Sequence, residues 1–365
     1  MTIQDLLQYL NELAPFTYQE SYDNSGLLVG DPKREITGVV VALDCTEEII
    51  DEAISAGANV VLTHHPVIFK GLKRLTGNDY VERTVIKALE NKIALVAIHT
   101  NLDNMPDGVN ARISDKIGLL NQKILSPKSG ILNKLTVFVP NDHLEKVSEA
   151  MFAAGAGKIG NYDSCGFTAE GTGTFRPLEG ADPYTGKINE RESASESRFE
   201  SIVPGDSLSN VVSVMLNAHP YEEVAYDIVP LANKHKNIGA GMIGDLEKEA
   251  SAEEFLMKIK SVFHCGVIRH TALTGKTIKK VAVCGGAGGF LLQDAIRQGA
   301  DIFITADYKY HEFFDADGKI IIADIGHYES EQYTSELLVE QLKKKFSTFA
   351  VRLTSINTNP IKYFI

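Results

Sequence analysis

The sequence predicts an α/β fold of two repeated α/β units whose mainly parallel sheets pack face to face, with an α+β domain inserted between them. The first observation is a repeat: the segment ITGVVVALDCTEEIIDEAISAGANVVLTHHP, from Ile36, recurs as IKKVAVCGGAGGFLLQDAIRQGADIFITADY, from Ile278. The second is that strand patterns alternate with helix patterns in both copies, which is typical of βαβ units and parallel sheets. The third is a different order of elements between the copies.

Each copy has an apolar run, a turn, an amphipathic helix, a glycine and a second apolar strand. EAISAGANVVLT and DAIRQGADIFIT match almost position for position. Gly57 and Gly299 stand where a helix ends in a residue that tolerates the left-handed conformation. Farther along, ALVAIHTNLD and IIADIGHYESE each read as a strand that ends at a histidine, with a carboxylate four residues later.

The region between the copies follows the order βαββαβ, which is a ferredoxin-like pattern. KLTVFVP predicts a strand, DHLEKVSEAMFAAG a helix and CGFTAEGTGTFRP a glycine-rich strand. The polar run YTGKINERESASES predicts a flexible loop, and RFESIVP, LSNVVSVMLNAH and EVAYDIVPL predict strand, helix and strand. We therefore expect residues 1–126 and 236–365 to form the two halves of one α/β domain, and 127–235 the insert.

Composition limits the class of protein. The chain has 365 residues, a formal net charge of −12 and a sequence pI near 5.4. A strongly negative body disfavours general affinity for nucleic acid. No cysteine belongs to a CxxC pair, so neither a thiolate zinc cluster nor a disulfide framework is indicated; the four are Cys45, Cys165, Cys265 and Cys284.

The N-terminal segment MTIQDLLQYLNELAP predicts an amphipathic helix with Thr2 and Asp5 placed for a capping box. It lacks the basic start and unbroken apolar stretch of a signal peptide. No segment approaches the roughly 20 apolar residues that span a bilayer. We expect a cytoplasmic protein.

Adjacent histidines in THHP are the first candidate ligands. His64 and His65 follow a buried apolar strand. Because consecutive strand side chains point to opposite faces, one metal ion can take both only if the strand is already turning, whereas two ions can take one each. The alternative is a capped strand end with hydrogen-bonded imidazoles.

His327 and Glu331 are the second pair of candidates. If a helix begins after Gly326, their spacing of four places both side chains on one face. A carboxylate has two oxygens, so Glu331 can bridge two cations. Asp103, four residues after His99, is the equivalent acid of the first half. Because ligands gather at the carboxyl ends of parallel strands, we expect the two sets to converge.

Imidazole and carboxylate without thiolate favour zinc, manganese or ferrous iron over calcium or magnesium. Two divalent cations suit a hydrolysis, because together they stabilise the attacking and the leaving oxygen. His99, Asp307 and His311 are further candidates, either to orient a ligand imidazole or to carry protons. Structural packing is the alternative for each of the three.

The CGGAGG loop, Cys284 to Gly289, follows a strand and opens a helix. Its N–H groups could hold a substrate phosphate at the helix N-terminus, or the glycines could serve only a tight turn. Cys284 has no visible partner base, so we expect an unreactive thiol.

In this order, YDNSGLLVG, LTHHP, AIHTNLD, the CGGAGG loop and GHYESE resemble the Nif-three-like family, whose members are called GTP cyclohydrolase 1 type 2 homologues. The resemblance covers essentially the whole chain. It implies a toroidal homohexamer, and it implies that the insert, with NAHPYEEVAYDIVPL, is the PII-like domain of the longer bacterial members. It also implies two divalent metal ions per subunit, zinc foremost, with the ligands His64, His65, Asp103, His327 and the bridging Glu331.

The leading functional hypothesis is a metal-dependent hydrolase that acts on a nucleotide or another phosphorylated small molecule, with His99 and His311 as catalytic candidates. The alternative is a regulatory, ligand-binding or metal-handling protein without turnover that senses through the PII-like insert. Nucleic-acid binding inside a ring cavity is a third possibility, which the net charge disfavours.

Overall fold

The computed structural model describes residues 1–273, 275 and 277–364, and it divides into two compact units. Unit 1 comprises Met1–Pro127 and Asn237–Ile365, and unit 2 comprises Lys128–Lys236. Together they hold three sheets with helices, a mixed α/β architecture. Within the described residues, no helix combines the length and the apolar character needed to cross a membrane.

The first sheet of unit 1 has the strand order β1-β4-β3-β2-β15. Its last four strands in that order run parallel, and β1 is antiparallel to β4. Every residue of β2, β3 and β4 is buried, as expected of parallel strands that are covered on both faces. The strands are β1 (Gly26–Val29), β2 (Gly38–Ala42), β3 (Val60–Thr63), β4 (Ala94–Ala97) and β15 (Ala350–Leu353).

Two predicted helix ends of this half are present in the structure. The capping box of Thr2 and Asp5 is confirmed at the start of the first helix. Gly57 follows the second helix with φ +66°, the left-handed conformation expected there. The helices are α1 (Ile3–Leu13), η1 (Phe16–Tyr18), α2 (Glu47–Ser55), α3 (Tyr80–Glu90), α4 (Thr100–Asp103) and α5 (Val109–Ile117).

The second sheet of unit 1 has the order β11-β14-β13-β12-β10-β5. Its central strands β12, β13 and β14 are parallel, whereas β10 pairs antiparallel with β12, and β11 pairs antiparallel with β14. The strands are β5 (Leu119–Ser129), β10 (Lys234–Ala250), β11 (Arg269–His270), β12 (Ile278–Val283), β13 (Ile302–Thr305) and β14 (Ile321–Asp324).

The predicted repeat has its counterpart in these elements. β2, α2 and β3 correspond to β12, the helical turns after it, and β13, and in each copy the two strands pair in parallel. Gly299 ends the second copy's helix with φ +71°. The helices of this half are α8 (Ala252–Val262), η3 (Gly289–Leu291), α9 (Leu292–Arg297), η4 (Tyr310–Ala316), α10 (His327–Glu331) and α11 (Thr334–Lys345).

The two halves exchange strands, which the repeat does not predict. β15 comes from the C-terminal half but pairs with β2 of the first sheet, with Ala350 opposite Gly38. β5 comes from the N-terminal half but lies beside β10 in the second sheet. Apolar side chains of both sheets, such as Val41 and Val281, belong to one buried cluster. Each half therefore completes the sheet of the other.

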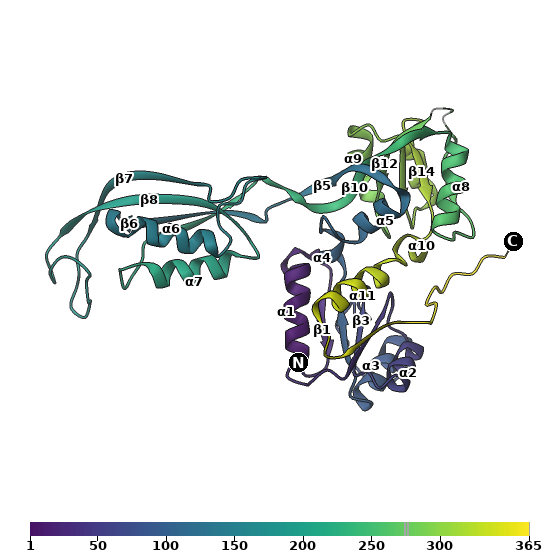
Figure 1. Cartoon of the computed structure of the whole chain (residues 1–365), viewed down its shortest axis with the longest axis horizontal. Helices are drawn as coiled ribbons and strands as arrows, with labels where there is room; N and C mark the ends of the chain where they lie inside the picture. The colour runs from purple at the N-terminus through teal and green to yellow at the C-terminus, as the bar shows by residue number, and fades with distance from the viewer. Residues whose placement is uncertain (274, 276, 365) are drawn as a thin grey trace. The chain divides into compact units, whose positions relative to one another are not determined.

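Unit 2 has the element order β–α–β–β–α–β and one antiparallel sheet, β7-β8-β6-β9. Its helices α6 and α7 cover one face of this sheet and enclose a separate core (Figure 1). The elements are β6 (Leu132–Pro140), η2 (Asn141–His143), α6 (Leu144–Ala153), β7 (Gly166–Phe175), β8 (Glu192–Pro204), α7 (Leu208–Ala218) and β9 (Tyr226–Leu231).

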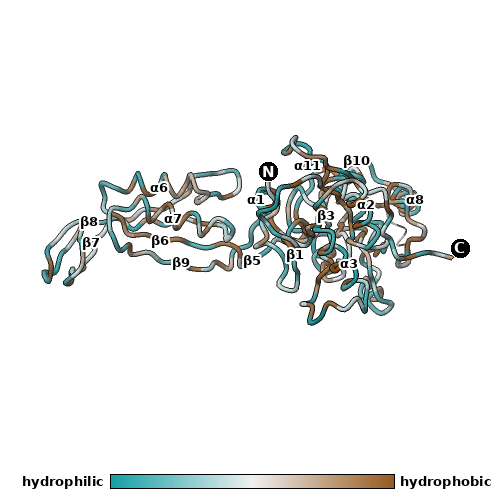
Figure 2. The backbone as a smooth tube through the Cα atoms, turned by 90° about the horizontal axis from the view of Figure 1, so that it is seen from below, coloured by the Kyte–Doolittle hydropathy of each residue, from teal (hydrophilic) through white to brown (hydrophobic). Residues whose placement is uncertain are grey.

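The predicted loop in unit 2 is too long. ESASES, its final part, is not loop but the start of β8, which begins at Glu192 opposite Phe175 of β7. β7 is exposed over most of its length, and β8 alternates between half-buried and exposed positions until Glu196 and Ser197, which are buried; the tube at β7 and β8 is coloured teal to white over much of its length (Figure 2). Because the half-buried and buried positions at the start of β8 carry Glu, Ala and Ser rather than large apolar residues, this part of the strand shows no apolar alternation and its sequence resembles a loop.

Candidate metal centre

Four imidazoles converge where strands of the first sheet end and α10 begins. His64 and His65 follow β3, His99 follows β4, and His327 is the first residue of α10. The chain bends directly after Thr63, so His64 and His65 do not alternate between faces, and their ring centroids are 5.0 Å apart. The chain thus turns at His64 and His65, as it must if both side chains are to bind at the same metal centre.

The Nδ1 atom of each ring lies within hydrogen-bond distance of an oxygen. These contacts fix the ring orientations, and Nε2 is the nitrogen that remains for a ligand. Metal-binding histidines are usually held in this way, by a carboxylate or a backbone carbonyl on the other ring nitrogen. The partners are the Ile98 carbonyl for His64 (2.9 Å), Asp44 for His65 (2.7 Å), Asp23 for His99 (2.7 Å) and Asp307 for His327 (2.7 Å).

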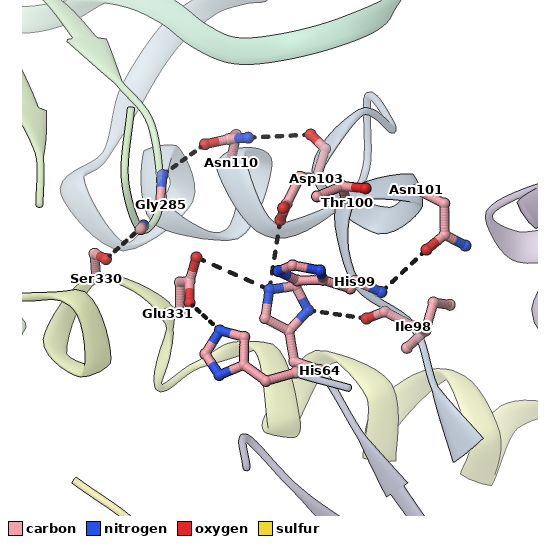
Figure 3. Close-up of polar contacts among 12 residues, drawn as sticks. His64, Ile98, His99, Thr100, Asn101, Asp103, Asn110, Gly285, Ser330 and Glu331 are labelled. Atoms are coloured by element: carbon pink, nitrogen blue, oxygen red, sulfur yellow. Dashed lines mark hydrogen bonds and ion pairs between the residues drawn. The ribbon is translucent and has the colours of Figure 1, made fainter. Parts of the chain in front are cut away.

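Glu331 lies at the centre of this group and is only 3% exposed. Its Oε1 is 3.9 Å from Nε2 of His64, whereas its Oε2 is 2.9 Å from Nε2 of His65 and 3.1 Å from Nε2 of His327. Asp103 approaches from α4, with Oδ1 3.6 Å from Nε2 of His64 (Figure 3). The two oxygens of Glu331 thus face different imidazoles, as a bridging carboxylate requires.

Two buried atoms of this group have no hydrogen-bond partner among the described residues: Nε2 of His64 and Oδ1 of Asp103. Leaving a buried donor or acceptor unsatisfied costs about 1–3 kcal/mol, so native proteins rarely do it without a reason. Both atoms are electron-pair donors that a cation would satisfy. Three overlapping sets of ligand atoms, each within 4.8 Å, occur among these residues, so the donor set fits a metal centre.

The electrostatics of the group favour positive charge. Burial and the neighbouring Glu331 raise the pKa of Asp103. Burial also acts to raise the pKa of Glu331, but the imidazoles, His327 foremost, outweigh it and hold that pKa well below its usual value. Burial acts to lower the pKa of His65, yet Asp44 and Glu331 raise it to about 9. The carboxylates that stabilise a proton on these rings stabilise a metal cation in the same way.

Two glycines let the backbone come close to the centre. Gly326 precedes α10 with φ +97°, and the predicted helix after it is confirmed, with His327 and Glu331 on one face. Gly286 has φ +60°, and a Cβ there would lie 2.6 Å from Oε1 of Glu331. A side chain at either position would displace a carboxylate or strain the loop.

The glycine loop serves packing here rather than phosphate binding. Gly285, Gly286 and Gly288 already donate their backbone N–H groups to protein oxygens, and α9, the helix that follows, has only six residues. Burial, with Asp103 and Glu331 nearby, raises the pKa of Cys284, which favours the unreactive thiol. The three acceptors are the side-chain oxygens of Asn110 (3.0 Å), Ser330 (3.0 Å) and Thr305 (2.9 Å).

Sequence reasoning missed two of the carboxylates that hold imidazoles, Asp44 and Asp23. Asp44 stands just beyond the end of β2, a place where the strand-end rule alone could have indicated it. It is itself held by Thr358, whose hydroxyl donates to Oδ2 at 2.6 Å. Asp23 lies in YDNSGLLVG, a segment whose residues are typical of an ordinary turn. It also accepts hydrogen bonds from the backbone N–H and the hydroxyl of Thr100. Asp307, a predicted candidate, holds His327.

A cavity of about 770 Å³ opens beside the centre, and all of its walls belong to unit 1. His99 lines it, but His311 does not: that residue is exposed on η4 with its ring against Tyr310. The structure thus brings His99 to the predicted ligands and leaves His311 apart. Aromatic rings form much of the wall, contributed by Tyr22, Phe69, Tyr80, Phe290 and Tyr328.

Comparison with known proteins places this geometry in a family. The sequence matches the family described as Duf34/NIF3 (NGG1p interacting factor 3) over residues 1–360. A Halalkalibacterium halodurans protein named GTP cyclohydrolase 1 type 2 homolog is 39% identical over 366 residues, which cover 99% of this chain and 98% of that protein. A Staphylococcus epidermidis protein of the same name is 37% identical over 367 residues and is matched along the full length of both chains.

The fold agrees with this match. The crystal structure of a Bacillus cereus protein related to NIF3 superposes with a TM-score of 0.84 at 35% identity, covering 100% of this chain and 99% of that one. The resemblance to the Nif-three-like family is thereby confirmed over the whole length. The chain belongs to the Duf34/NIF3 family.

Proposed function

We propose that unit 1 binds two divalent cations between its two halves, zinc first and manganese or iron as alternatives. The observation that carries this proposal is the convergence of tethered imidazoles on Glu331, with two buried donor atoms that have no other described partner. Histidine and carboxylate ligands without thiolate suit these metals. The proposed ligands are His64, His65, Asp103, His327 and Glu331, with Glu331 shared by both ions.

We further propose that the centre hydrolyses a nucleotide or another phosphorylated small molecule. Divalent cations supply Lewis acidity that polarises the scissile group and stabilises charge on its oxygens. The cavity of about 770 Å³ is in the range that holds small organic ligands, and the relatives' name supports a nucleotide. With its Nδ1 held by Asp23, His99 has Nε2 free to accept or donate a proton at the substrate.

A second candidate function is ligand sensing without turnover. The observation that favours it is unit 2, a compact unit with a sheet and a buried core of its own. We propose that unit 2 is a PII-like sensory domain; its βαββαβ order and four-stranded antiparallel sheet support this.

Metal content tests the ligand set. In protein purified without chelator or nickel, we expect about two metal ions per chain, and one or none in Glu331→Gln, because an amide cannot supply the anionic bridge. Glu340→Gln is the matched control, since that side chain is half exposed on α11 and paired with Arg112. Elemental analysis measures all three proteins. Equal metal content in Glu331→Gln and the control would exclude the proposed bridge.

The tether of His65 is tested by Asp44→Asn. This change removes the negative charge beside Nδ1 of His65 while keeping the shape of the side chain, so we expect metal affinity to fall about 10- to 100-fold. Competition with a chromophoric chelator measures it. Asp51→Asn, an exposed change on α2, is the control and should match the wild type. An unchanged affinity in Asp44→Asn would mean that the tether is only structural.

Turnover tests the proposed reaction. The metal-loaded protein is assayed against a panel of nucleoside triphosphates and phosphoesters, and we expect hydrolysis of at least one that Glu331→Gln abolishes. His99→Ala should lower kcat by about 10²-fold or more with metal content unchanged, because proton transfer of this kind contributes at least that much. His311→Ala is the control. If no compound is hydrolysed, the sensing function is favoured instead.

Assembly follows from the family resemblance. We propose a toroidal homohexamer in which the two halves of unit 1 pack face to face and the metal centres face an internal space. Light scattering should then give six times the 39.9 kDa of one chain. The strongly negative net charge favours small molecules over nucleic acid as its contents. The mass of a single chain in this measurement would contradict the proposed hexameric ring.

A further inference from the structure

A second cavity, of about 440 Å³, lies within unit 2 next to the loop that joins β7 and β8. All its lining residues belong to unit 2, and none lines the cavity at the metal centre. Its size is in the range of small-ligand sites. Four side chains give it its chemical character: Glu196, Phe175, Tyr184 and Tyr221.

Glu196 is a buried acid in this wall. It is 8% exposed, and its Oε1 accepts a hydrogen bond of 2.9 Å from the hydroxyl of Tyr221. Among the described residues, no Lys, Arg or His nitrogen forms an ion pair with it, whereas Glu200 on the same strand pairs with both Lys134 and Arg198. Buried glutamates are rarely left without a cationic partner, because desolvating their charge is expensive. A cation from outside the chain would supply that partner.

A glycine of the neighbouring strand β7 leaves space for the carboxylate of Glu196. Gly173 of β7 faces Glu196, and a Cβ at Gly173 would lie 2.0 Å from Oε2 of Glu196. Because Gly173 has no side chain, the carboxylate of Glu196 can occupy this space. Burial, and then the hydrogen bond to Glu196, raise the pKa of Tyr221, so its hydroxyl keeps its proton and remains a donor. One oxygen of Glu196 is thus engaged, and Oε2 has no hydrogen bond within the described chain.

Aromatic rings stand around the acid. The ring centroid of Tyr221 is 5.9 Å from that of Phe175 and 5.9 Å from that of Tyr184, with interplanar angles of 58° and 44°. All three rings line the cavity that Glu196 lines. Cations gain energy within about 6 Å of an aromatic centroid, and organic cations also bury their carbon atoms there.

The charge of the lining selects the ligand. Glu196, Glu222 and Glu223 line the cavity together with one cation, Arg176, which leaves a net charge of −2. Phosphorylated ligands are therefore disfavoured. A metal ion is disfavoured as well, because the clusters of potential metal ligands found among the described residues all lie in unit 1. A small organic molecule with a positive charge matches both the negative lining and the aromatic rings.

We propose that this cavity binds a small organic cation, with an ammonium or guanidinium group on Glu196 and its carbon atoms against Phe175, Tyr184 and Tyr221. The proposal rests on the second candidate function, ligand sensing by unit 2, and gives it a ligand class. It does not depend on the metal centre.

Calorimetric titration of the full-length protein tests the proposal. The probes are agmatine, putrescine and tetramethylammonium, with 1,4-butanediol as the uncharged analogue and ATP as the anionic one. We expect at least one cation to bind with a dissociation constant below 1 mM, and neither butanediol nor ATP to displace it. Which cation binds best distinguishes a guanidinium, a primary ammonium and a quaternary ammonium site.

Variants locate the site. Glu196→Gln keeps an acceptor for Tyr221 but removes the charge, so affinity should fall at least tenfold. Gly173→Ala should weaken binding by displacing the carboxylate. Glu200→Gln, on the same strand but outside the cavity, should bind as the wild type does. Thermal melts confirm that each variant folds, and metal content should stay unchanged in all of them.

The outcomes separate this proposal from the metal-centre proposal. Loss of cation binding in Glu196→Gln with normal metal content supports the site, whatever the turnover assays give. Absence of binding by all three cations, binding that is unaltered in Glu196→Gln, or preference for butanediol or ATP would each overturn it.

Discussion

The buried carboxylate of Glu331 constrains most of unit 1. Removing an acid from water costs several kcal/mol unless positive groups surround it closely, and here three imidazoles do. Those imidazoles must be turned toward it, which explains the carboxylates and the carbonyl on their far nitrogens. The glycine loop must also pass within van der Waals distance of Glu331, which explains why Gly286 lacks a side chain. The core, the loops and the strand ends all accommodate this one group.

The centre is also divided between the two halves of the repeat. His64, His65 and Asp103 come from the first half, and His327 with Glu331 from the second. A centre of this kind keeps its geometry only if the halves are held in register. The exchanged strands and the shared buried cluster do this, because they tie the backbone of each half to the sheet of the other. The relative positions of the candidate ligand side chains are thus set by the pairing of the two sheets and not by the loops alone.

The sequence predicted the parts of the site that are local or repeated. The spacing of His327 and Glu331 is set by one helical turn, and the equivalence of Asp103 follows from the repeat, so both could be read directly. The strand-end position of Asp44 could have marked it as a candidate, but its hydrogen bond to His65 could not be predicted, because the two residues come together only when β2 and β3 pair. The contact of Thr358 with Asp44 spans almost the whole chain. The start of β8 was misplaced because its residues are polar even where they are buried, as Glu196 is.

The exchange of β5 and β15 has a consequence for cooperativity. A half that opened on its own would take a strand out of the other half's sheet and expose that sheet's edge and core. Local opening is rare where it must break many buried contacts at once, so the two halves are expected to unfold as one transition. Protection of β2 and β12 amides from hydrogen exchange would then be nearly equal, although the two strands lie in different sheets. The duplicated sequence is thus one thermodynamic unit.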